Sequence, residues 1–227
     1  MNLDVKRYVQ GAKEARGTCV VIDVFRASNT VMSLLSRGPH CIIPVACLSV
    51  ANLVKQENPD YILIGERGGK TLEGFDHDNS PTAVLGLDLA GRTVILATSA
   101  GSKVIAHARL TDEVIVASFA NARAVADYVR VARPEQATIL VAGHNGETEA
   151  EEDEACAAYI GALIRGEEPE DFWGRVRERL LRSPGAERLR SLGQEADLEY
   201  CLRLDCTDIV PRASKGLGLW RFRPPEQ

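Results

Sequence analysis

The chain has 227 residues, 45% of them hydrophobic, and a formal net charge of −5 at pH 7. The length allows a sizeable core, and the acidic balance argues against a broad surface for nucleic acid. No run approaches the roughly 20 apolar residues of a membrane span, and the first residues lack the apolar core of a secretory signal. Six scattered cysteines without a C-x-x-C pair suggest reduced thiols, so we expect a cytoplasmic protein.

Short apolar runs rich in Val and Ile alternate with helix-like stretches in the first part of the chain. The expected strands are residues 18–24, 41–45, 61–64, 93–97, 113–117 and 137–142. The expected helices between them are residues 29–36, 49–57, 102–109 and 120–133. Continuous apolar strands indicate a sheet that is covered on both faces. The alternation therefore predicts an α/β fold, with a layered, largely parallel sheet flanked by helices.

The pattern changes after Gly146 and predicts a helical C-terminal portion. Further helices are expected at residues 151–165, 171–182, 186–192 and 196–204, followed by a short strand at 219–222. No low-complexity linker separates this portion, so the simpler interpretation is a single α/β domain over residues 1–227. The alternative is a C-terminal subdomain from about residue 147 to 227. An α/β protein of this size often forms a homo-oligomer.

Polar clusters follow several of the expected strands, and ligands bind beyond the carboxyl ends of strands in open α/β sheets. The clusters contain Asp23 with Arg26, Glu66 with Arg67, a turn at 98–102, and a loop at 74–81. Carboxylates, arginines, an amide, a hydroxyl and glycines together suit a divalent cation beside a phosphate oxyanion. Only one or two carboxylates of the acidic run 147–154 can face such a site, because neighbours on a helix point apart.

Each cluster also has a plainer interpretation. Asp23 could cap a helix, Glu66 and Arg67 could form a surface ion pair, and the turn at 98–102 could simply start a helix. His77 and His144 fall in candidate loops. They could act as acid–base groups, or they could be ordinary surface residues. The segment 206–212 has the C-x5-R spacing of cysteine-dependent phosphatases, but Pro211 lacks the N–H that such a loop needs.

An ordered set of segments resembles the 2-phosphosulfolactate phosphatase family, magnesium-dependent hydrolases known from coenzyme M biosynthesis. The resemblance runs from Val20 to about Arg212. Its landmarks are Ile22-Asp23-Val24-Phe25-Arg26, Gly65-Glu66-Arg67-Gly68-Gly69, Gly74-Phe75-Asp76, Asn79-Ser80-Pro81, Ser118 with Asn121, Ala142-Gly143, Glu152-Asp153, Cys156-Ala157, and Asp205 with Val210-Pro211. The chain departs from the family pattern at three positions of the expected pocket. Ala100 replaces an amide, Asn29 replaces Thr or Ser, and Asp78 stands where glycine is usual.

The resemblance implies a Mg²⁺-dependent phosphatase that converts a small anionic phosphate monoester, 2-phosphosulfolactate or an analogue, to sulfolactate and phosphate. The expected metal ligands are Asp23, Glu66 and Asp153. Asp23 and Asp76 are the expected catalytic residues, Asp76 by orienting the attacking water. The expected substrate-binding residues are Arg26, Arg67, Asn79, Ser80, Ser99, Gly101 and Asn121. Direct hydrolysis and a covalent intermediate on Asp23 are both open.

Two other classes of function stay open at this point. The same residues could bind an acidic phosphorylated metabolite without turnover, and the amide lost at Ala100 makes that alternative worth testing. A structural or interaction protein would have no anion or metal site at this edge of the sheet.

Overall fold

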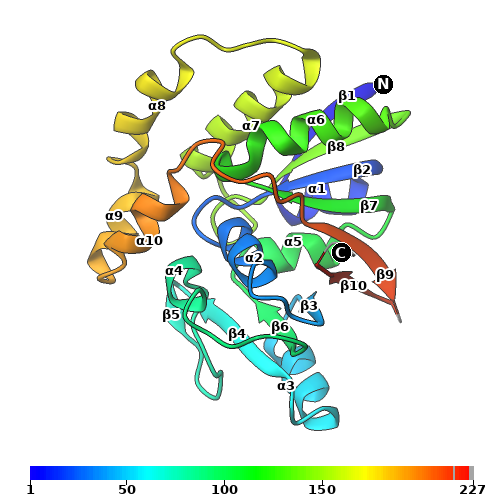
Figure 1. Cartoon of the computed structure of the whole chain (residues 1–227), viewed down its shortest axis with the longest axis vertical. Coiled ribbons are helices and arrows are strands. Elements are labelled where there is room, and N and C mark those ends of the chain that lie inside the picture. The colour runs from blue at the N-terminus through cyan, green and yellow to red at the C-terminus, as the bar shows by residue number, and fades with distance from the viewer. Residues whose placement is uncertain (217, 225–227) are drawn as a thin grey trace.

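The computed structural model of the protein describes residues 1–216 and 218–224. Their strands form one ten-stranded sheet, in the order β1-β8-β2-β7-β9-β10-β3-β6-β4-β5 (Figure 1). The strands are β1 (Asn2–Arg7), β2 (Gly17–Ile22), β3 (Cys41–Pro44), β4 (Ile62–Arg67), β5 (Lys70–Thr71), β6 (Thr93–Ala97), β7 (Thr111–Ala117), β8 (Gln136–Val141), β9 (Arg212–Gly216) and β10 (Leu219–Phe222). The pairs β1–β8, β2–β8, β2–β7, β3–β6 and β4–β6 are parallel, which confirms the predicted largely parallel sheet.

Helices cover both faces of the sheet. Successive side chains of a strand point to opposite faces, and in the central strands the side chains on both faces are apolar. Val20 and Ile22 of β2 pack on one face with α6 (Ala122–Ala132) and α7 (Glu151–Arg165). Cys19 and Val21 pack on the other face with α1 (Tyr8–Glu14), α2 (Ala27–Leu35) and α5 (Gly101–His107). In the second half of the sheet, α3 (Leu48–Glu57) covers Ile43 and Ile95. The predicted α/β layering is confirmed.

The C-terminal portion is helical, as predicted, in α8 (Phe172–Leu180), α9 (Pro184–Ser191) and α10 (Glu195–Cys201). These helices lie together beside the sheet, at the left of Figure 1, and α10 packs near the short helix α4 (Pro81–Val84). The hydroxyl of Ser183 caps α9 by accepting a hydrogen bond from the N–H of Ala186, and Pro184 occupies its first turn. The start of α9 is therefore fixed by local sequence.

A hairpin of β9 and β10 lies between the two groups of parallel strands. β9 pairs antiparallel with β7, and β10 pairs antiparallel with β3. The strand predicted at 219–222 is confirmed as β10, whereas the edge strand β1 was missed because charged residues interrupt its short sequence. All six cysteines are free thiols; four of them are buried, and Cys47 and Cys206 are exposed. Across the described residues, every helix is too short or too polar to cross a membrane.

Candidate active site

A cavity of about 920 Å³ lies at the carboxyl ends of the parallel strands. Its walls come from the segments at the ends of β2, β4, β6 and β8, from the first turn of α7, and from α9. The three predicted metal ligands, Asp23, Glu66 and Asp153, line this one cavity although they are far apart in the sequence. The fold therefore brings together acidic groups from two strand ends and from the start of a helix.

The carboxylate of Asp23 is buried between two helix N-termini. Its Oδ2 accepts a hydrogen bond of 2.7 Å from the N–H of Gly101 in α5, and its Oδ1 accepts one of 3.3 Å from Ala27 in α2. A glycine is required at 101, because a Cβ there would lie 2.7 Å from Oδ2 of Asp23. Burial and the charge of Glu66 raise the pKa of Asp23 to about 6, against the effect of these N–H groups.

Glu66 is held by the main chain of two neighbouring loops. Its Oε1 accepts a hydrogen bond of 2.6 Å from the N–H of Ser99, and its Oε2 accepts one of 2.8 Å from the N–H of Gly69. The N–H groups of Ser99 and Gly101 were expected to bind substrate, yet here they orient Glu66 and Asp23. Their contact with substrate stays a prediction, whereas their contact with the carboxylates is part of the fold.

Asp153 lies in the first turn of α7 and is 2% exposed. Its Oδ1 accepts a hydrogen bond of 2.7 Å from the N–H of Val24, and its Oδ2 accepts one of 2.9 Å from the N–H of Gly143. Burial, followed by the charges of Asp23 and Glu152, raises the pKa of Asp153 well above its ordinary value. The carboxylate thus links the strand ends of β2 and β8 and lies close to other negative charges.

Glu152 is a fourth buried carboxylate of the cavity; it is a landmark of the family resemblance, but no role was predicted for it. Burial raises its pKa to about 7; the nearby charge of Arg188 lowers this pKa and that of Asp23 raises it. The start of α9 lies directly against it, because a Cβ on Gly185 would be 2.6 Å from Oε1 of Glu152. A carboxyl with a pKa near neutrality can hold or release a proton at physiological pH.

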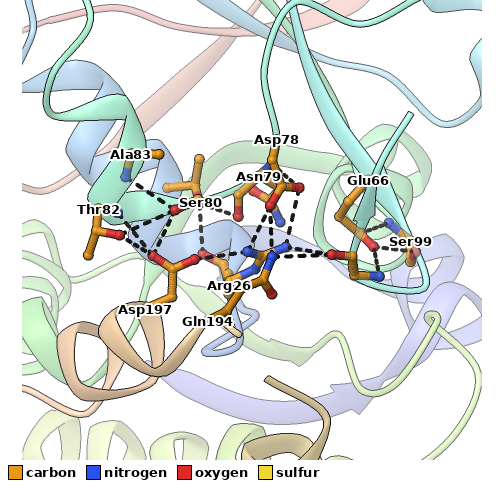
Figure 2. A network of polar contacts seen from close by, with 12 residues as sticks. Arg26, Glu66, Asp78, Asn79, Ser80, Thr82, Ala83, Ser99, Gln194 and Asp197 are labelled. Atoms are coloured by element: carbon orange, nitrogen blue, oxygen red, sulfur yellow. Dashed lines mark hydrogen bonds and ion pairs between the residues drawn. The ribbon is translucent and has the colours of Figure 1, made fainter. Parts of the chain in front are cut away.

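Arg26 lines the cavity, but two carboxylates share its charge (Figure 2). Its Nη1 donates to Oδ2 of Asp78 at 3.0 Å and to Oδ2 of Asp197 at 2.9 Å. Asp197 comes from α10 and also accepts a hydrogen bond of 2.8 Å from the hydroxyl of Ser80. The network ties the end of β2, the loop before α4, and α10 into one frame. Substrate contact by Arg26 and Ser80 stays a prediction. In the structure both side chains donate hydrogen bonds to Asp197.

Asn79 and Arg67 lie differently with respect to the cavity. Asn79 lines it, and its buried Oδ1 has no hydrogen-bond partner in the part of the chain that the structure describes. The side chain of Arg67 is not among the lining groups; its Nη1 donates to the carbonyl oxygens of Glu66 and Ala97. Of these two predicted substrate-binding residues, the structure therefore brings Asn79 to the cavity.

Asp76 and Asn121 are also absent from the cavity lining. Asp76 accepts a hydrogen bond of 2.7 Å from the N–H of Leu63 and is partly exposed. Asn121 closes a capping box with Ser118 and donates to the carbonyl oxygen of Ile209 at 2.9 Å. Both side chains hold loops in place, so the roles predicted for them in water orientation and substrate binding have no support from their positions.

Comparison with known proteins identifies the family. Residues 5–216 match the family model described as 2-phosphosulpholactate phosphatase. The chain belongs to this family. A relative from Carboxydothermus hydrogenoformans, named "Probable 2-phosphosulfolactate phosphatase", is 34% identical over 93% of this chain and 92% of its own length. Relatives of the same name from Caldicellulosiruptor saccharolyticus (34% identical, 84% and 86% covered) and Deinococcus radiodurans (33% identical, 87% and 88% covered) are also similar.

This member of the 2-phosphosulpholactate phosphatase family has a cavity residue that the sequence analysis missed. Arg188 of α9 lines the cavity and donates from Nη1 to Nδ1 of His144. Burial and the charge of Arg188 lower the pKa of His144. Arg188 stands in an arginine-rich stretch with Arg182 and Arg190, and composition alone does not separate it from them.

Two of the departures from the family pattern have structural partners here. Asp78 pairs with Arg26, as described above. Asn29 is fully buried and donates from Nδ2 to the carbonyl oxygen of Val24 and to the hydroxyl of Ser118, both at 2.9 Å. Ala100 lines the cavity beside Gly101. The N–H groups of the turn keep their carboxylate partners without an amide side chain at 100.

Proposed function

We propose that the protein is a Mg²⁺-dependent phosphatase that hydrolyses a small, highly anionic phosphate monoester, 2-phosphosulfolactate, to sulfolactate and phosphate. The observation that carries the proposal is the convergence of Asp23, Glu66, Glu152 and Asp153 in one cavity at the carboxyl edge of the sheet. The names of the relatives support the choice of substrate. A buried cluster of carboxylates is costly unless a cation or a proton relieves the repulsion.

The donor set fits Mg²⁺. Within the described part of the chain, no group of three or more His, Cys, Asp or Glu side chains is close enough to hold a metal ion by itself. Mg²⁺ does not need such a cage, because it keeps several waters and takes one or two carboxylates together with substrate oxygens. One or two of the carboxylates Asp23, Glu66 and Asp153 would supply these hard oxygen ligands, together with water and substrate oxygens. A bound Mg²⁺ would offset the negative charge of the cluster and stabilise charge on the phosphoryl group.

The protein's own groups would position the reaction and move its proton. The N–H groups of Gly101 and Ser99 fix Asp23 and Glu66, so these carboxylates need no reorganisation when the substrate arrives. Glu152, with a pKa of about 7, is the candidate to take the proton of the attacking water or to give one to the leaving oxygen. This position in the cavity makes Glu152 a better candidate than Asp76 for the acid–base role.

A panel of phosphate monoesters, assayed with and without Mg²⁺, tests the proposal. We expect phosphate release from 2-phosphosulfolactate, loss of activity with a chelator, and a loss of several orders of magnitude in kcat for Asp23→Asn. The exposed Asp127→Asn is the matched control and should behave as wild type. Unchanged activity of Asp23→Asn would remove that residue from the mechanism. Metal-dependent binding of the esters without any phosphate release would instead support a metabolite-binding protein.

A further inference from the structure

Carboxylates outnumber guanidinium groups among the lining residues of the cavity, seven to three. A substrate with several negative charges therefore meets a wall that repels it, except where a metal ion or an unpaired arginine lies. An arginine of the cavity can bind a substrate anion most readily if no carboxylate of the protein already pairs with it. This inference deepens the proposed function and rests on it for the nature of the substrate.

Two of the three arginines already have carboxylate partners. Arg26 pairs with Asp78 and Asp197, and both members of the second pair are 2% exposed. Arg179 of α8 pairs with Glu151. In these pairs the positive charge is compensated, and a substrate anion would have to displace a carboxylate to gain the same contact. The net gain in binding free energy from replacing one carboxylate by another anion is small.

Arg188 differs from both. Among the described residues no carboxylate forms an ion pair with it, and its one hydrogen-bond partner is the ring of His144. Its Nε is buried and has no partner in the described structure. Because a guanidinium can only donate, Nδ1 of His144 must accept, so the proton of a neutral ring lies on Nε2. Arg188 thus has an oriented guanidinium with N–H groups to spare.

The geometry of α9 aims this guanidinium at the reacting region. Gly185 and Arg188 are three residues apart and share a helix face with the buried Leu189. Gly185 touches Glu152, so the same face lies against the carboxylate cluster. Arg188 also lies close enough to the cluster for its charge to act on Asp23 and Glu152. The exposed Arg190 lies on another face of the same helix.

We propose that Arg188, oriented by His144, forms a subsite on the α9 wall that binds an oxyanion of the substrate, either the phosphoryl group or the sulfonate. The planar fork of a guanidinium matches the oxygens of both groups and can bind them through two parallel hydrogen bonds. The subsite would place one cation near the carboxylates that would hold the metal, so the anion would contact both the guanidinium and the metal ion.

Calorimetric titration of inorganic phosphate and of sulfoacetate, each with Mg²⁺ present, tests the proposal on wild type, Arg188→Met, Arg188→Lys and the control Arg190→Met. We expect Arg188→Met to weaken the binding of one anion at least about tenfold and Arg190→Met to change neither. Loss confined to phosphate assigns the subsite to the phosphoryl group, and loss confined to sulfoacetate assigns it to the sulfonate. Equal affinities in Arg188→Met and wild type, or no binding of either anion by wild type, would overturn the proposal.

Arg188→Lys keeps the test decisive if the methionine variant fails to fold. Lysine retains the charge but not the fork, so we expect an intermediate loss of affinity, and an unchanged affinity would count against the subsite. Binding and turnover separate the two proposals. Anion binding that depends on Arg188, without phosphate release from any ester, would refute only the phosphatase function. Phosphate release with unchanged anion affinity and unchanged kcat/KM in Arg188→Met would refute only the subsite.

Discussion

Arg26 and Asp197 form an ion pair of 2.9 Å in which each side chain is 2% exposed. We expect Arg26→Met to lower the free energy of unfolding by about 3–5 kcal/mol, because it leaves buried carboxylates without their cation. Urea denaturation measures this loss. Arg165→Met is the control: Arg165 and Glu167 form an exposed pair, and about 0–1 kcal/mol is expected there. Equal losses in the two variants would show that the Arg26 network adds no special stability.

Gly101 determines where the carboxylate of Asp23 lies. In Gly101→Ala the new Cβ would lie 2.7 Å from both Oδ2 of Asp23 and Cβ of Ala27, so the carboxylate must move. We expect kcat/KM to fall by about 100-fold, the order of loss that a displacement of about 1 Å produces in a positioned site. Gly86→Ala is the control, because its Cβ would make an ordinary contact of 3.6 Å. Full activity of Gly101→Ala would mean that Asp23 need not be held in place.

Mg²⁺ should stabilise the folded protein even without substrate, because it binds the folded carboxylate cluster and not the dispersed side chains of the unfolded chain. At a Mg²⁺ concentration 100 times its dissociation constant the gain is about 2.7 kcal/mol. Thermal unfolding with chelator and with increasing Mg²⁺ measures it. Asp23→Asn should reduce the shift of Tm, whereas Asp127→Asn should keep it. A wild-type Tm that does not respond to Mg²⁺ would argue against the metal.

Without metal, stability should fall as the pH rises toward neutrality. The pKa values of Asp23 and Glu152 rise from 3.8 and 4.5 to about 6 and about 7 on folding. The folded state therefore binds these protons more tightly than the unfolded chain, and each contribution is lost as the pH rises through the folded pKa. We expect a lower Tm in chelator at pH 8 than at pH 6.

Glu152→Gln isolates one of these contributions. The lowered pKa of His144 acts in the opposite direction, and this variant keeps His144. The difference in Tm between pH 6 and pH 8 should therefore shrink in Glu152→Gln relative to wild type. If the two proteins show the same difference, Glu152 does not titrate with a raised pKa.

The sequence predicted the features that depend on short-range patterns. Continuous apolar runs located the central strands, and the acidic first turn of α7 with Arg165 at its end marked that helix. The convergence of Asp23 and Glu66 was also predictable, since parallel strands end at one edge of a sheet. The edge strand β1 and the short helix α4 have too few residues for a pattern to emerge.

The partners of charged side chains were harder to predict from the sequence than the positions of the strands. Arg26 was expected to bind substrate, but it forms an ion pair with Asp197 of α10. The two residues are far apart in the sequence, and no local pattern predicts their contact. Arg188 was missed for the converse reason, because its neighbours in an arginine-rich stretch are exposed. Which partner a charged side chain finds is decided by contacts between distant segments, and these appear only when the chain is folded.

The position of the β9–β10 hairpin has a consequence for how the chain reaches its native state. The strands β9 and β10 join β7 to β3, yet the ribosome makes them after every other strand of the sheet. The group β1, β8, β2, β7 and the group β3, β6, β4, β5 can each pair during synthesis, but the seam between them must wait for this segment. The nascent protein should thus mature in a late closing step, during which the unpaired edges of β7 and β3 are targets for chaperones or for aggregation.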